Sequence, residues 1–215
     1  MLQLLDSEFA AKNIPSADVM PIVYGTEDLA EAGDIVIKIS DSADGVTSDD
    51  GYAVEISDKA VVNARTSKGA FYGAHEVMKE LIKGGGTAEA QSFTENPAAD
   101  MRAVFVDIGR QYYSVEWLES LIKQMAWLKM NTLYLDFANN EGFRFLLDDS
   151  TFSANGQTFD INSMVSEDCL SESEMNEIFA TAEKYGVEII PSLNTPGHMG
   201  RILSQTKNQY GVDYS

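Results

Sequence analysis

The sequence predicts a small α+β domain followed by the first part of an α/β barrel of the TIM type, which this chain leaves incomplete. Short β-prone runs surround one helical pattern in residues 1–97, whereas strands and helices alternate over 98–215. A full (β/α)8 barrel takes about 250 residues. The roughly three strands expected here would therefore supply less than half of one. An open doubly wound sheet is the alternative, although three strands make a poor sheet.

The first region is expected to contain four short strands and one helix. The strands are predicted at 19–24, 35–39, 52–56 and 60–64. A helix is predicted over 69–82, with an apolar face made of Phe71, Ala74, Val77, Met78 and Leu81. Glycines at 84–86 and Pro97 predict a loop over 84–100 that separates the two regions.

The second region alternates strictly between strands and helices. In chain order we expect a strand at 103–106, a helix at 115–129, a strand at 132–137, a long loop over roughly 138–170, a helix at 172–185 and a strand at 187–191. Ser114 is the predicted N-cap of the first helix. Ser171 and Glu174 predict a capping box on the second, which ends before Gly186. This order implies parallel strands joined by right-handed crossovers.

Charge and hydropathy narrow the function classes. The net charge of −19, from 34 acidic and 15 basic residues, argues against nucleic acid and anionic membranes as partners. No apolar run reaches the ~18 residues that a membrane span needs. The first six residues are too short and too soon acidic for a signal peptide, so either the protein is cytoplasmic or an export signal precedes them.

Metal and cofactor sites have little support in the sequence. The single cysteine, Cys169, excludes an internal disulfide and predicts an inert thiol. Only His75 and His198 are present, so a site with three histidine ligands is excluded. The acidic loop around Asp41 and Asp49 lacks the spacing of an EF-hand. We expect no metal and no cofactor.

Polar residues follow each predicted strand of the second region. They are Asp107 and Arg110 after the first, Asn139, Asn140, Glu141 and Arg144 after the second, and Asn194 and His198 after the third. The carboxyl ends of parallel strands meet at one edge, where α/β enzymes carry their functional groups. Such side chains can bond sugar hydroxyls or pair with a carboxylate, so the pattern predicts a functional site at this edge. The acidic charge balance fits neutral substrates such as sugars, and many others as well.

Four stretches carry a resemblance to glycoside hydrolase family 20, which contains β-N-acetylhexosaminidases and lacto-N-biosidases. They are 102–110 (Arg-Ala-Val-Phe-Val-Asp-Ile-Gly-Arg), 129–135 (Lys-Met-Asn-Thr-Leu-Tyr-Leu), 141–144 (Glu-Gly-Phe-Arg) and 191–198 (Pro-Ser-Leu-Asn-Thr-Pro-Gly-His). Residues 52–56 and 69–74 are similar to the small α+β domain that precedes the barrel in this family. The resemblance spans roughly 20–200.

The resemblance implies an exo-β-N-acetylhexosaminidase that acts on N-acetylhexosamine-containing glycans. In this family the 2-acetamido oxygen of the substrate attacks the anomeric carbon, outside the two-carboxylate scheme. An Asp-Glu pair after the fourth strand steers that group and serves as general acid and base. Arg110 falls where the family holds hydroxyls of the terminal sugar, and His198 where a histidine supports the acid–base region. The substrate-binding positions also include Asn139, Asn140 and Glu141.

The sequence departs from the family pattern at several carboxylates. Asn139 and Asn140 replace its Asp-Asp, and Ser192 and Asn194 replace its Glu and Asp. If Asn139 faces His198, the histidine lacks an anionic partner. We find no fourth strand and no Asp-Glu pair, so we expect this chain to be inactive as it stands and to self-associate through its incomplete barrel. A lacto-N-biosidase-like enzyme and a degenerate, non-catalytic sugar-binding module are the alternatives.

Structural roles compete with each of these assignments. Arg110 could simply pair with Asp107, and the two asparagines and the histidine could only shape turns. Glu141 is as easily a solvated surface residue, and Arg144 the partner of a strand-end carboxylate. The cellular location stays unknown from the sequence, whereas the resemblance implies a secreted or cell-surface bacterial protein at full length.

Overall fold

The computed structural model describes residues 4, 8, 11 and 23–214. The chain divides into two compact units, Met1–Asp100 and Met101–Ser215, which are treated separately below. Most of the strand predicted at 19–24 lies outside the described residues, and residues 23–24 are not in a strand. Among the helices that can be described, none has the length and apolar character needed to cross a membrane.

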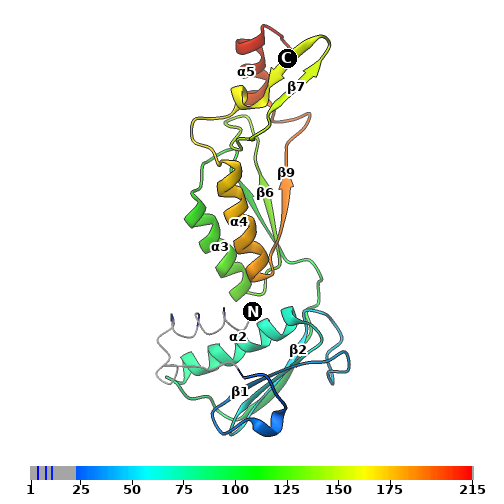
Figure 1. Cartoon of the computed structure of the whole chain (residues 1–215), viewed down its shortest axis with the longest axis vertical. Coiled ribbons are helices and arrows are strands. Elements are labelled where there is room, and N and C mark those ends of the chain that lie inside the picture. Colours follow the sequence, from blue (N-terminus) through cyan, green and yellow to red (C-terminus); the bar gives the residue numbers. More distant parts are fainter. Residues whose placement is uncertain (1–3, 5–7, 9–10, 12–22, 215) are drawn as a thin grey trace. The chain divides into compact units, whose positions relative to one another are not determined.

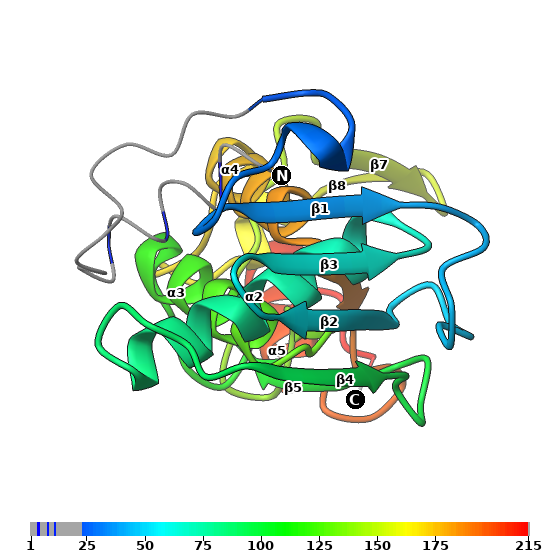
Figure 2. The same cartoon turned by 90° about the horizontal axis from the view of Figure 1, so that it is seen from below.

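The first unit is a four-stranded sheet with one long helix on it (Figure 2). Its elements are a 3-10 turn, η1 (Glu27–Leu29), the strands β1 (Ile35–Ile39), β2 (Tyr52–Ile56), β3 (Ala60–Ala64) and β4 (Gln91–Glu95), and the helix α2 (Ser67–Lys83). The strand order is β1-β3-β2-β4, with β1 and β3 parallel and the other pairs antiparallel. The small α+β arrangement expected from the sequence is therefore present.

Glycine in α2 lets this helix approach the sheet closely. A Cβ atom on Gly73 would lie 2.5 Å from Cγ1 of Val62, which is inside any real contact distance. Tyr52 and Val54 alternate inward from β2 and are almost fully buried, as a half-covered strand requires. Thr66 caps the helix by accepting a hydrogen bond from the Gly69 N–H.

Strand β4 corrects the prediction of a loop over 84–100. Its sequence, Gln-Ser-Phe-Thr-Glu, has a single large apolar residue and gave little sign of a strand. It lies at the edge of the described sheet, where β2 is its one neighbour among the described strands, and most of its side chains face solvent. An edge strand forms through its backbone pairing and does not need an apolar face.

The second unit contains the predicted parallel sheet, in the order β5-β6-β9. Its main elements are β5 (Ala103–Asp107), α3 (Val115–Trp127), β6 (Thr132–Asp136), α4 (Glu172–Tyr185) and β9 (Glu188–Ser192). Helices α3 and α4 lie side by side along one face of the sheet (Figure 1). Leu133 and Leu135 of β6 are fully buried. The predicted capping box at Ser171 is confirmed, and Gly186 ends α4 in the left-handed conformation.

The predicted loop over 138–170 is also corrected, because it contains a β-hairpin. Strands β7 (Thr151–Ala154) and β8 (Gln157–Asp160) are followed by the 3-10 turn η2 (Ile161–Met164). Asn155 and Gly156 connect the two strands with φ angles of 52° and 78°. Asn-Gly is the preferred sequence for such a two-residue hairpin turn.

A further helix, α5 (Gly200–Tyr210), follows His198 and was not predicted. It packs on η2, where Arg201 donates hydrogen bonds to the carbonyl oxygens of Met164 and Val165 at 3.2 and 3.0 Å. Gly211 ends it in the left-handed conformation. The segment after β6 and the segment after β9 therefore support each other beyond the ends of the strands (Figure 1).

Candidate functional site

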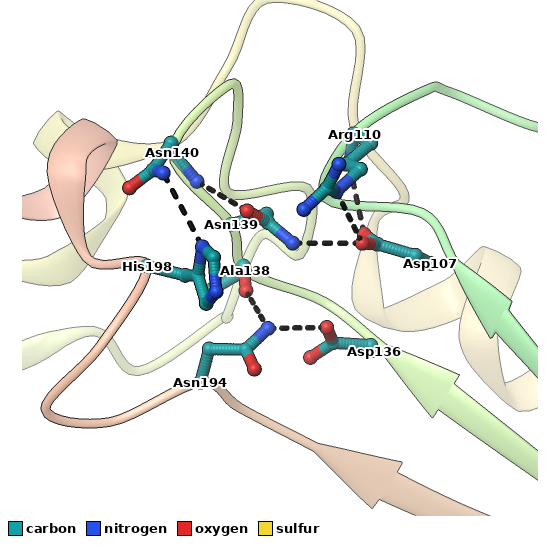
Figure 3. A network of polar contacts seen from close by, with 8 residues as sticks. All are labelled: Asp107, Arg110, Asp136, Ala138, Asn139, Asn140, Asn194 and His198. Carbon is teal, nitrogen blue, oxygen red and sulfur yellow. Dashed lines mark hydrogen bonds and ion pairs between the residues drawn. The ribbon is translucent and has the colours of Figure 1, made fainter.

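Three loops meet where the parallel strands end (Figure 3). Asp107, Asp136 and Ser192 are the last residues of β5, β6 and β9, and they lie opposite one another in the register of the sheet. The pleat alternates sides, so residues in one register position project to the same face. The strand ends therefore place two carboxyl groups on adjacent strands.

Asp107 joins the first loop to the second. One carboxylate oxygen, Oδ1, accepts a hydrogen bond from the Arg110 backbone N–H at 2.9 Å. The other, Oδ2, lies 3.1 Å from Nε of Arg110 and accepts from Nδ2 of Asn139 at 2.7 Å. The side chain of Arg110 is 56% exposed, and its terminal nitrogens have no partner in the described part of the chain. Asp107 thus orients a guanidinium whose outer donors remain available to a ligand.

The loops after β5 and β6 touch at Gly109. A Cβ atom there would lie 2.6 Å from the Asn139 backbone nitrogen and 2.8 Å from the carbonyl carbon of Ala138. Only glycine leaves room for this contact, which brings Asn139 within reach of Asp107. Asn139 is buried, and its side-chain oxygen accepts from the Asn140 N–H at 2.8 Å.

Asn140, and not Asn139, is the residue that faces His198. Its Nδ2 lies 3.3 Å from Nδ1 of the histidine, and its Oδ1 accepts a hydrogen bond from the Gly200 N–H at 3.0 Å. Asn139 turns toward Asp107 instead, so the condition that Asn139 faces His198 is not met. The side chain that contacts the histidine is still a neutral amide, but it belongs to Asn140. His198 is exposed, with φ at 56°.

Asp136 is a member of this network that sequence reasoning missed. It is 1% exposed, and its Oδ2 accepts a hydrogen bond from Nδ2 of Asn194, which also donates to the Ala138 carbonyl at 3.0 Å. Burial raises the pKa of Asp136, and the nearby Asp107 carboxylate raises it further, whereas the Asn194 hydrogen bond and His198 lower it. The sequence contained one indication of this role. Asp136 is an aspartate at the end of a largely apolar strand, and it lies in register with Asp107.

Two candidate residues stand apart from this network. Glu141 is exposed and, among the described residues, shares no hydrogen bond with these loops. Arg144 is buried and pairs with the Asp168 carboxylate, and it also donates to the Asp168 carbonyl at 2.8 Å. The ion pair has the structural character that the alternative predicted, but Asp168 lies in the long loop and not at a strand end.

Burial raises the pKa of the nearby Cys169 thiol, which disfavours its reactive thiolate form.

The chemistry of the assembled site is that of hydrogen bonding. Arg110, Asn140 and His198 offer donors and acceptors at its surface. Asp107 binds Arg110 and Asn139, and Asp136 binds Asn194. A guanidinium and side-chain amides suit hydroxyl and acetamido groups.

Comparison with known proteins identifies the family. Residues 100–213 match the model of glycosyl hydrolase family 20, catalytic domain. The chain belongs to glycosyl hydrolase family 20. The resemblance predicted from the sequence is therefore confirmed.

Two curated relatives match this chain at low identity. The chain is 22% identical over 195 residues to a β-hexosaminidase of Vibrio vulnificus, covering 82% of this chain and 23% of the relative. It is 24% identical over 171 residues to a lacto-N-biosidase of Bifidobacterium bifidum, covering 79% and 14%. The chain thus spans less than a quarter of the length of either relative.

A solved family 20 structure shares the fold. A mutant β-hexosaminidase of Streptomyces plicatus, in complex with its product GlcNAc, superposes with a TM-score of 0.72 at 18% identity. The match covers 98% of this chain and 43% of that one. The fold of the present chain therefore corresponds to a part of a larger family 20 structure.

Proposed function

We propose that this chain forms one side of the sugar site of an exo-β-N-acetylhexosaminidase, which removes terminal N-acetylhexosamine from glycans. The observation that carries the proposal is the hydrogen-bonded network that joins the ends of β5, β6 and β9 through Asp107, Asn140 and Asn194. Its surface donors suit a neutral sugar, and the relatives and the GlcNAc complex support that ligand class. We also infer that residues 98–215 are the first part of a (β/α)8 barrel and 1–97 its preceding α+β domain.

In this proposal Arg110 holds hydroxyl groups of the terminal sugar. Its Nε is occupied by Asp107, and the side chain is 56% exposed, so the terminal N–H groups are left for a ligand. His198, steadied by Asn140, supports the region in which the leaving oxygen is protonated. The family's substrate-assisted, retaining reaction also requires the Asp-Glu pair, and no Asp-Glu dipeptide occurs in this sequence. We therefore propose that the chain binds the sugar and does not turn it over.

Titration with N-acetylglucosamine, followed by NMR, tests the binding. The wild-type chain should show saturable shifts, and Arg110→Ala should weaken binding about tenfold, since it removes hydrogen bonds from a charged donor worth roughly 1.5 kcal/mol or more. Lys207→Ala is the matched control, because it also removes an exposed cation that is paired with a carboxylate. Equal binding by Arg110→Ala and the wild type would sink the assigned role.

Two alternatives have an observation in their favour. Asparagines at 139, 140 and 194 where the family pattern has carboxylates favour a non-catalytic sugar-binding module. The Bifidobacterium relative favours a lacto-N-biosidase-like site. Tighter binding of the disaccharide lacto-N-biose than of N-acetylglucosamine would select the second. Any turnover of p-nitrophenyl N-acetylglucosaminide by the purified chain would contradict the proposed lack of activity.

A further inference from the structure

Asp136 has no part in the proposed sugar contacts, yet it is the most buried carboxyl group of the network. It is 1% exposed. Its Oδ2 accepts from Asn194, whereas its Oδ1 is buried and has no hydrogen-bond partner among the described residues. Burying a carboxyl oxygen without a hydrogen-bond partner costs free energy. Such a cost suggests that the group serves a purpose other than stability.

Asn194 links this carboxyl group to a loop that is otherwise exposed. Both of its hydrogen bonds, to Asp136 and to the Ala138 carbonyl, run from the loop after β9 to the end of β6. Leu193 is 56% exposed, and residues 195–198 are exposed too. Asn194 therefore fixes the start of this loop by hydrogen bonds to the end of β6. Asn140 fixes its end by contacts with His198 and Gly200.

We propose that Asp136 is a positioning residue that holds the loop 193–199, and with it His198, against the end of β6 through Asn194. The assembly of Asp136, Asn194 and the Ala138 carbonyl is called the loop clamp below. Its relevance to sugar binding rests on the proposed function. The clamp itself concerns only the conformation of the loop and can be measured without any sugar.

The surroundings of Asp136 make the clamp sensitive to pH. The charged groups that act on it are the Asp107 carboxylate at the end of β5 and His198 in the loop itself. Burial and Asp107 together raise the pKa of Asp136 despite the opposing effect of Asn194 and His198. When the carboxylate takes up a proton, its hydrogen bond from Asn194 loses charge assistance. The clamp should therefore weaken as pH falls, beginning above the ordinary aspartate range.

The amide NMR signals of Gly197 and Gly200, recorded between pH 3.5 and 7, report the loop position. The wild type should show an inflection above the ordinary aspartate value of 3.8. Asp136→Asn keeps an acceptor for Asn194 but cannot titrate, so this inflection should vanish. It should survive in His198→Gln, which replaces the imidazole with a neutral amide. An inflection that persists when Asp136→Asn is combined with His198→Gln would overturn the proposal.

Asn194→Ala removes the clamp from the loop side, at a partly exposed position. Both glycine signals should shift at every pH, and N-acetylglucosamine affinity should fall about fivefold, as for one lost hydrogen bond. Asn208→Ala, the same change at an exposed site on α5, should match the wild type. Unchanged loop signals in Asn194→Ala would refute the clamp. If the signals respond as expected while the wild type binds no sugar, the clamp stands and the proposed function fails.

Discussion

His198 has a backbone conformation that its own sequence does not favour. Its φ of 56° lies in the left-handed region, which costs a non-glycine residue about 1 kcal/mol or more. The contact with Asn140 and the adjacent Gly200–Asn140 bond hold it there. A strained backbone at an exposed histidine on a strand-end loop is more typical of a functional position than of a simple turn.

The sequence could predict which residues gather at the site, but not how they pair. Arg110, Asn140 and His198 follow strand ends, and parallel strands bring such ends together. Two adjacent asparagines, however, point in opposite directions, and no pattern indicates which of them faces the histidine. Asp136 was missed because it was counted within an apolar strand, where position and not composition gives it a role.

Asp136 should make the fold less stable at neutral pH. A carboxyl group whose pKa is raised by folding binds its proton more tightly in the folded chain than in the unfolded chain. The resulting stabilisation of the folded chain is complete at pH values below 3.8, the ordinary pKa of aspartate. It is lost as the pH rises through the raised pKa of Asp136 in the folded chain. Asp136→Asn, which is neutral at all pH, should therefore be more stable than the wild type at pH 7, by on the order of 1 kcal/mol.

Urea unfolding at a series of pH values measures this difference. The gap between Asp136→Asn and the wild type should shrink as the pH is lowered toward 4. Asp41→Asn, at an exposed position of the first unit, provides the matched control and should show no such gap. A variant less stable than the wild type at pH 7 would mean that the Asn194 bond outweighs burial.

At the scale of secondary structure, the prediction succeeded where apolar periodicity was strong. Helices α3 and α4 and the three parallel strands were found within one or two residues of their bounds, because each buries one face. Strand β4 has a single large apolar residue and helix α5 is mostly polar, and both form through contacts with partners that the sequence does not reveal. The hairpin was different, since Asn155-Gly156 was a usable turn signal.

The loops after β5 and β6 depend on a single glycine for their contact. Gly109→Ala would place a Cβ atom 2.6 Å from the Asn139 nitrogen, so one loop must move. We expect a loss of about 1–3 kcal/mol in the free energy of unfolding, the usual range for overpacking. The displaced Asn139 should also loosen its bond to Asp107 and weaken sugar binding. Gly197→Ala is the control, because no atom lies within 4 Å of its Cβ position.

At the scale of the whole molecule, the two faces of the parallel sheet differ. Helices α3 and α4 lie along one face of the sheet (Figure 1). Leu133 and Leu135, which share one face of β6, are fully buried. The opposite face carries a row formed by Phe105, Tyr134 and Ile190, which are paired in register across the sheet. Phe105 is 61% exposed, an unusual state for a phenylalanine in the middle of a strand.

This row should drive self-association of the isolated chain. Apolar side chains that lie together on a sheet gain free energy when a second surface removes them from water, at about 25 cal/mol per Å². Light scattering should show a mean mass that rises with concentration, and Phe105→Ser should lower it. Phe179→Ser is the matched control, because Phe179 is 41% exposed but lies on α4, away from the row. A wild-type chain that stays monomeric at all concentrations, or an equal effect of both substitutions, would show that the row is not the contact surface.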